Sequence, residues 1–262
     1  MKKLAMLATI SLIALAALSL TGCIQAHSDT VIEKDGSGTA TLTMSMSPAM
    51  SEAIRDMEEL GMTQGQEMEV PKFDDINKDD LVKAAKGHGV KITKFEKGTV
   101  DGREKLDIAM EFEDLKSLSY VMGSLMGGNP GEGMGIFETD DGNFVLKQAT
   151  YDFPDEPAED VEESAPAPKA EGDTGKPVLT AEEKSAKQME VYGKLMAAVG
   201  ELDIKFTITV PGEIIESNAP AVEGTTSIWA INPSNMMNQQ DQNMEPVITF
   251  SSKGLKIKAL KE

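Results

Sequence analysis

The chain has 262 residues, one cysteine and a formal net charge of −19. A chain this acidic repels nucleic acid phosphates and anionic lipid headgroups, so it is not expected to bind DNA, RNA or a membrane through surface charge. A single cysteine excludes an intramolecular disulfide, and the length allows one large domain or two small ones.

The N-terminal 23 residues are organised like the signal of a bacterial lipoprotein. Two lysines precede 17 uncharged and mostly apolar residues at positions 4–20. This run is at the short limit for a transmembrane helix, and no basic stop-transfer cluster follows it. It ends in Leu20-Thr21-Gly22-Cys23, which resembles a lipobox. The resemblance implies that residues 1–22 are a cleaved signal peptide and that the sulfur of Cys23 carries a diacylglyceryl group.

Lipidation would account for the odd cysteine, for which the alternative is a buried structural thiol behind a cleaved signal. Removing residues 1–22 takes away two lysines and leaves 23 basic and 44 acidic residues, a net charge of −21. Bacterial lipoproteins carry several acyl chains, which anchor a protein firmly, whereas a single chain does so only marginally. No later segment reaches about 18 consecutive apolar residues. The predicted location is therefore the cell envelope, membrane-anchored and extracytoplasmic, and facing the periplasm in a Gram-negative host.

Three strand pairs are predicted in the N-terminal half, each around a short turn. The turns are Asp35-Gly36-Ser37-Gly38, Asp101-Gly102 and Asp140-Asp141-Gly142-Asn143, whose residues tolerate the positive φ that tight turns require. Apolar residues alternate with polar ones in the return strands, which places the apolar set on one face of a sheet. His27 is predicted to lie in a tether between the anchor and the first strand.

Helices are predicted between these hairpins. Ser47 and Pro48 are typical of a helix start, residues 79–86 form a second short helix, and Asp114 is placed to cap a third. The stretch 127–135 contains five glycines and is predicted to be a flexible loop.

Residues 152–178 are predicted to form a disordered, acidic, proline-rich linker. Positions 152–173 hold nine acidic residues and four prolines with almost nothing to bury, so the segment cannot offset its ordering entropy. A segment that recruits a partner is the alternative. After it, a Thr180–Glu183 capping box begins a helix with Met189, Tyr192, Met196 and Val199 on one face.

The clearest strand pattern of the whole chain, at residues 204–210, follows that helix, and Pro211-Gly212 then breaks or bends the strand. Two more strands are predicted at residues 226–231 and 247–251. Strand pairs separated by helices predict an α+β fold, with an antiparallel, hairpin-rich sheet packed against helices on one face. Residues 23–151 are expected to form its N-terminal part and residues 179–262 to complete the same domain.

The segment from Ile208 to Ala219 reads I-T-V-P-G-E-I-I-E-S-N-A, with Gly224 and Trp229 shortly after it. This strand–Pro-Gly–strand–Asn–Gly–Trp pattern is similar to the end of LppM-type bacterial lipoprotein domains, and the placement of Cys23 before the first strand also fits. The resemblance implies a mixed α/β envelope domain with an apolar ligand cavity that binds lipid or lipoglycan. From its own sequence context, Trp229 is expected to be a core or rim residue, with ligand stacking as the alternative.

No motif for catalysis, cofactor binding or metal binding is present. His27 and His88 are the only histidines, and neither belongs to a zinc motif or to a Ser-His-acid arrangement with a nucleophile elbow. The glycine-rich stretch lacks the Gly-Lys-Ser/Thr ending of a phosphate loop. The acidic turn near Asp140 lacks the spacing of a calcium-binding EF-hand. The sequence therefore predicts a protein that is not an enzyme.

Methionine is unusually frequent, with 17 residues. Nine of these lie on apolar faces of predicted elements: Met44, Met46, Met50, Met57, Met110, Met122, Met126, Met189 and Met196. They fit adaptable core packing, or else a deformable apolar pocket for an acyl chain or a peptide. Three hypotheses follow. The first is a lipid-anchored envelope protein with a binding or structural role and a possible lipid or protein partner. The second is an apolar-ligand carrier, and the third is an enzyme with an unrecognised site.

Overall fold

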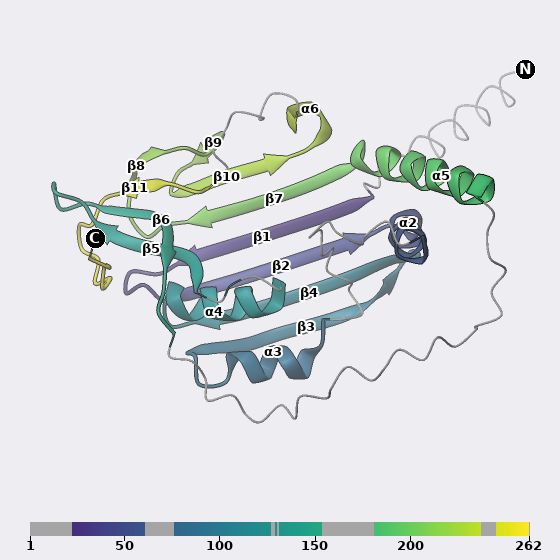
Figure 1. Ribbon diagram of the computed structural model, residues 1–262. Helices are drawn as coiled ribbons and strands as arrows, with labels where there is room; N and C mark the ends of the chain where they lie inside the picture. Colours follow the sequence, from purple (N-terminus) through teal and green to yellow (C-terminus); the bar gives the residue numbers. More distant parts are fainter. Residues whose placement is uncertain are drawn as a thin grey trace, which may run out of the picture.

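The computed structural model describes residues 23–60, 76–126, 129, 131–153, 181–236 and 245–261. These residues form an α+β architecture with two β-sheets and helices beside the larger one (Figure 1). The predicted signal peptide, the loop residues 127, 128 and 130 and the linker beyond Phe153 lie outside the described residues, so the character predicted for them stays a prediction.

Seven strands form the main sheet, in the order β3-β4-β2-β1-β7-β10-β9. Their bounds are β1 Ile24–Ile32, β2 Gly38–Met46, β3 Val90–Val100, β4 Arg103–Phe112, β7 Leu202–Thr209, β9 Ala221–Glu223 and β10 Thr226–Ile231. Neighbouring strands are antiparallel except β1 and β7, which run parallel. The predicted α+β fold with hairpin-rich sheets packed against helices is confirmed, and the one parallel pair makes the main sheet mixed instead of antiparallel throughout. Parallel neighbours need a long crossover connection, and here the connection contains most of the other elements.

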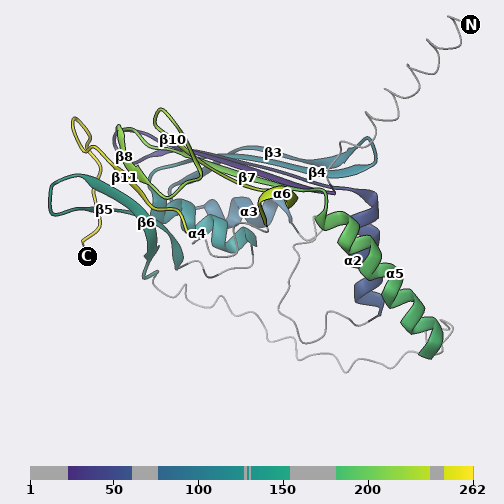
Figure 2. The same cartoon turned by 90° about the horizontal axis from the view of Figure 1, so that it is seen from above.

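One face of the main sheet forms the core. In β4, Leu106, Ile108, Met110 and Phe112 are buried and alternate with less buried residues, as the period of two predicts. The helices α3 (Lys78–Ala85) and α4 (Leu115–Met126) cover this face (Figure 2). The helix starts follow the predicted chemistry, because Asp114 accepts a hydrogen bond from the amide of Ser117 at 2.8 Å.

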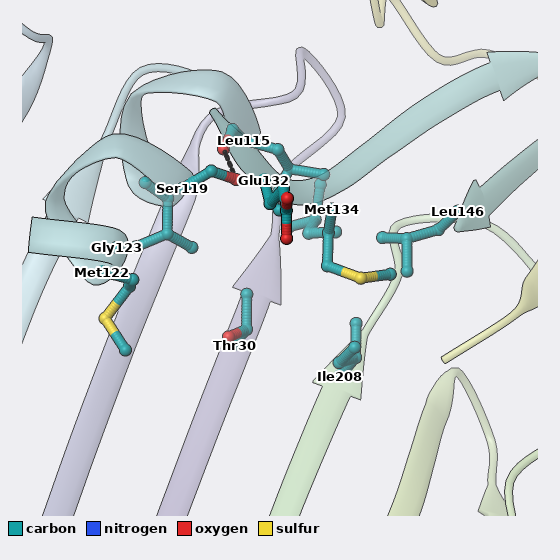
Figure 3. A pocket seen from close by; sticks show the side chains of 12 residues that line it. Thr30, Leu115, Ser119, Met122, Gly123, Glu132, Met134, Leu146 and Ile208 are labelled. Atoms are coloured by element: carbon teal, nitrogen blue, oxygen red, sulfur yellow. Dashed lines mark hydrogen bonds between the residues drawn. The ribbon is translucent and has the colours of Figure 1, made fainter. Parts of the chain in front are cut away.

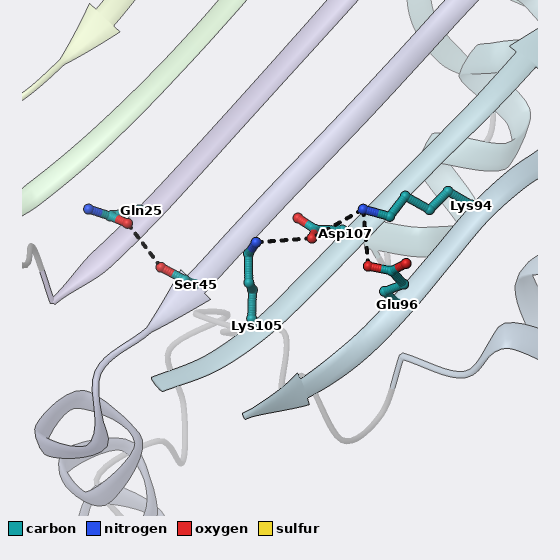
Figure 4. A network of polar contacts seen from close by, with 6 residues as sticks. All are labelled: Gln25, Ser45, Lys94, Glu96, Lys105 and Asp107. Carbon is teal, nitrogen blue, oxygen red and sulfur yellow. Dashed lines mark hydrogen bonds and ion pairs between the residues drawn. The ribbon is translucent and has the colours of Figure 1, made fainter. Parts of the chain in front are cut away.

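The other face of the main sheet is polar. Asp107 on β4 accepts hydrogen bonds from Lys105 at 3.1 Å and from Lys94 at 3.5 Å, and Lys94 also contacts Glu96 at 3.1 Å (Figure 4). Burial disfavours the charged form of Asp107, but hydrogen bonds from Lys105 and Thr43 and the charges of the two lysines outweigh this and hold the pKa of its carboxyl below the ordinary value. This face is thus stabilised by side-chain pairs across strands.

A second sheet has the order β5-β6-β11-β8 and lies at one end of the main sheet (Figure 1). Its strands are β5 Glu132–Glu138, β6 Phe144–Thr150, β8 Ile214–Ser217 and β11 Ile248–Phe250. The prediction of a loop over residues 127–135 was wrong at its end, because Gly133 and Gly135 belong to β5. Glycine is required at both positions by close packing: a Cβ at Gly133 would collide with Ser119, and one at Gly135 with Ala149 and Leu260.

Pro211 and Gly212 lie where the chain leaves the main sheet and enters the second one. Gly212 is required because a Cβ there would collide with the backbone oxygen of Ser251. Gly212 is not among the glycines with a positive φ, so close packing and not backbone conformation requires glycine here. The C-terminal segment also joins the two sheets, since Lys256 donates to the carbonyl of Lys34 and Leu260 to that of Ile136, both at 2.7 Å.

Two helices project from the opposite end of the main sheet, α2 (Pro48–Glu59) and α5 (Ala181–Val199), and they pack on each other (Figure 2). A short helix, α6 (Pro233–Met236), follows β10. The buried side of α5 centres on Val191, which is 0% exposed. Lys194 on the same side contacts Glu52 and Asp56 of α2 at 3.4 and 3.5 Å. Lysine stems can pack on apolar surface while their ammonium groups pair with acids.

Candidate functional site

Cys23 lies at the very start of the first strand. It directly precedes Ile24 of β1, and its carbonyl accepts a hydrogen bond from the amide of Ser47 at 2.8 Å. Its sulfur is 3.1 Å from Oε2 of Glu201, beside the end of α5. Burial and the neighbouring carboxylate of Glu201 raise the pKa of the thiol, and a hydrogen bond with Ser47 offsets this only in part. A raised pKa opposes the thiolate form that nucleophilic or metal-binding cysteines need.

No tether separates Cys23 from the sheet. The prediction that His27 lies in a tether was wrong, because His27 is in the middle of β1, and its Nε2 is 3.2 Å from Oδ2 of Asp203 on β7. The sequence did not predict that this segment is a strand, since Gln25, His27 and Asp29 are polar. They are accommodated because every second residue of β1 faces the polar side of the sheet.

An apolar cavity of about 170 Å³ lies between α4, the second sheet and the main sheet (Figure 3). Its apolar walls come from α4, from β5 and β6, and from the inner face of the main sheet. They are Ile32, Leu115, Leu118, Met122, Met134, Leu146 and Ile208. Thr30 and Ser119 add two hydroxyl groups, and the hydroxyl of Ser119 already donates to the carbonyl of Leu115 at 2.7 Å. Glu132, whose side chain is exposed, lines the edge of the cavity.

The cavity lies beside a rigid contact between α4 and β5. Because Gly133 has no side chain, the strand approaches Ser119 of the helix closely, and this contact holds one wall in place. Tyr151 buttresses β5 by donating a hydrogen bond to the carbonyl of Met134 at 2.6 Å. Burial, and to a smaller extent the charge of Asp114, raises the pKa of Tyr151 to about 12, so this donor stays protonated at neutral pH.

The methionines divide into three groups. Met46 and Met110 are core residues, and Met44, Met50 and Met57 are half-buried. Met122 lines the cavity, together with Met134, which the sequence placed in a loop and did not single out. Met189 and Met196 are 74% and 71% exposed, so core packing was the wrong interpretation for these two. The side chain of Met126 lies outside the described residues.

The remaining candidates serve the fold. The ring of His88 stacks on Tyr120 with centroids 3.7 Å apart, in the predicted glycine-flanked turn. Trp229 is 1% exposed and stacks on Phe206 at 5.0 Å, which confirms it as a core residue. Its Nε1 has no hydrogen-bond acceptor within the described residues. In the same part of the chain, no group of three or more histidines, cysteines and acids could hold a metal ion, and no helix has the length and apolarity to cross a membrane.

Comparisons with known proteins give little direct guidance. No family model matches the chain, and no curated protein matches it. Among solved structures, the chain is similar to the folded domain of the LppM protein of Mycobacterium tuberculosis, determined by NMR. The two share 10% sequence identity with a TM-score of 0.39, over 88% of this chain and 91% of that domain.

Proposed function

We propose that the protein is a lipid-anchored, extracytoplasmic protein of the bacterial cell envelope with a non-enzymatic binding role. The observation that carries this proposal is the position of Cys23. It follows a lipobox-like sequence and immediately precedes the first core strand. Cleavage before Cys23 would remove only residues that precede the fold and would leave the folded domain attached to acyl chains without a spacer.

The surroundings of Cys23 fit an attachment point better than a reactive centre. The pKa of the thiol is raised, and the thiol donates a hydrogen bond to the carboxylate of Glu201. The carboxylate of Glu201 raises the pKa of the thiol and so disfavours the thiolate. Its side chain is only partly buried, so an attached glyceryl thioether can extend away from the sheet.

The anchor is tested by replacing Cys23 with alanine in the complete precursor and fractionating cells. The unmodified protein should sediment with membranes and gain the mass of a diacylglyceryl adduct on its N-terminal peptide. The Cys23→Ala variant should be released or remain unprocessed. A variant that is still processed and still sediments with membranes would rule out the lipid anchor.

For the binding role, the cavity favours a small apolar ligand. An apolar cavity of about 150 Å³ in another protein stays dry and accepts benzene, and the present one is about 170 Å³. A cavity of this size holds a group about as large as benzene, so only part of a long acyl chain would fit inside it. The rest would leave the cavity at the edge lined by Glu132.

Native mass spectrometry of the mature protein with Cys23→Ser tests the ligand. After gentle extraction from the envelope, a co-purifying lipid that is lost on unfolding supports binding in the cavity. A clean apo mass over several preparations, together with no response to added short-chain lipid, contradicts it. The anchor is unaffected by that outcome, since the variant carries no acyl chain of its own.

A further inference from the structure

The outer side of α5 carries an exposed apolar stripe, defined here as Met189, Tyr192 and Met196. These side chains are 74%, 56% and 71% exposed. Their spacing of three and four residues places them on one side of the helix, away from the buried Val191. Met189 and Met196 are the two most exposed large apolar residues in the described part of the chain.

The positions around the stripe are uncharged. Ser185, Ala186, Gly193 and Ala197 are exposed beside it, and none bears a charge. The lysines in the middle of the helix face α2 instead, where Lys187 and Lys194 lie within 4 Å of Asp56. A chain with a strong excess of acids thus presents one helix side that lacks charge and is apolar along three turns.

The stripe begins close to the predicted anchor. Met196 precedes Glu201 by five residues, about 8 Å along a helix axis, and Glu201 contacts the sulfur of Cys23 at 3.1 Å. The exposed Val100 lies at the same end of the sheet, since Gly102 of the adjoining turn lies near Pro48, 3.7 Å from where a Cβ on Gly102 would be. Because Cys23 has no tether to β1, lipid attached to its sulfur would hold this end of the domain at the headgroups.

We propose that the stripe of α5 inserts into the surface of the bilayer that holds the acyl chains of Cys23, with the helix axis along the membrane. This inference rests on the proposed lipid anchor. Helices with one apolar side lie in the interface between headgroups and acyl chains. The tyrosine has an apolar ring and a polar hydroxyl, which suits that depth. Apolar contact is the available attraction, since the protein is too acidic to be drawn by anionic lipids.

A single fluorescent label tests the proposal, because lipidation consumes the only native thiol. Met196→Cys is expressed as the full precursor, purified in lipidated form, labelled with nitrobenzoxadiazole and reconstituted into phosphatidylcholine vesicles. Aqueous dithionite then reduces labels that water reaches. The matched control is Asp141→Cys, an exposed turn position of the second sheet at the other end of the molecule. Both labels are also measured in soluble protein with Cys23→Ser.

The label at position 196 should be reduced at least about fivefold more slowly than the label at 141 in vesicles, and at a similar rate in the soluble protein. Equal rates in vesicles, with the diacylglyceryl adduct confirmed by mass, would refute the insertion of the stripe into the bilayer. The proposed lipid anchor would be unaffected. Slow reduction in the soluble protein as well would also refute the insertion, since a second copy or the chain itself would then cover the stripe. Absence of the adduct would refute the anchor and the stripe together.

Discussion

Filling the cavity should stabilise the protein and abolish its response to small apolar molecules. Thr30 on β1 lines the cavity and is half-buried, so Thr30→Ile replaces its hydroxyl by an ethyl group directed at the empty space. Residual cavity volume costs about 24 cal/mol per Å³ in a well-studied series of core variants. On that scale a void of about 170 Å³ costs at most about 4 kcal/mol. Each buried methylene contributes roughly 0.8 kcal/mol, so Thr30→Ile should raise the free energy of unfolding by about 1 kcal/mol.

The assay is urea denaturation of the mature protein with and without benzene. A ligand at ten times its dissociation constant stabilises the native state by about 1.4 kcal/mol, so the unmodified protein should gain up to this amount. Thr30→Ile should gain much less, because the probe has lost its space. Thr41→Ile is the matched control, since Thr41 is exposed on the polar face of β2 and should leave the benzene response unchanged.

Two results would refute this reasoning. If Thr30→Ile lowers the stability by more than about 1 kcal/mol, the added atoms overpack a filled region and the void does not exist in solution. If both isoleucine variants respond to benzene like the unmodified protein, the probe binds elsewhere.

Three further variants test the packing and the charges. Gly133→Ala should destabilise by about 1–3 kcal/mol in urea through collision with α4, whereas Gly98→Ala in open space should be neutral or slightly stabilising. Tyr151→Phe should cost about 1 kcal/mol for the lost hydrogen bond to Met134, and should remove the phenol that titrates near pH 12 in absorbance. Asp107→Asn should destabilise by about 0.5–1 kcal/mol at pH 7, and this difference should disappear in acid.

The direction of that pH dependence follows from the lowered pKa of Asp107. A carboxyl whose pKa is lower in the folded state contributes stability above its unfolded value of 3.8 and loses it as the pH falls through the folded value. Urea midpoints from pH 2 to pH 7 should therefore converge for the two proteins below pH 3.8. A gap that persists to pH 2 would mean that Asp107 acts through packing instead of charge. A Gly133→Ala variant as stable as the Gly98→Ala control would contradict the close contact of α4 with β5.

The hairpin turns were predictable from the sequence because a few neighbouring residues determine each of them. The turns at Asp35, Asp101 and Asp140 form as predicted, since residues that tolerate tight turns stand between alternating strands. The parallel pairing of β1 with β7 was not predictable, because its partners are far apart in the chain. A single sequence contains no local signal for such a contact.

The apolar side of α5 was predicted to be buried, and this was wrong for a physical reason. Its most apolar side faces solvent, and the side that packs on α2 contains Lys187 and Lys194 around Val191. Helical periodicity identifies an apolar side without showing what covers it. The acids of α2, Glu52 and Asp56, are what make the lysine side the buried one, and they become neighbours only in the folded chain.

The cavity depends on tertiary packing in the same way, and its size bears on function. It forms where α4, two strands of the second sheet and the inner face of the main sheet meet, around the contact of Gly133 with Ser119. Because the cavity is partly open at the edge lined by Glu132, about 4 kcal/mol is an upper bound on its cost, to be set against the 5–15 kcal/mol that stabilise a typical domain. Selection removes proteins that fall below the stability needed for function, and a bound apolar ligand would restore the missing contacts. Occupancy by such a ligand is therefore the state in which the proposed envelope protein should reach its full stability.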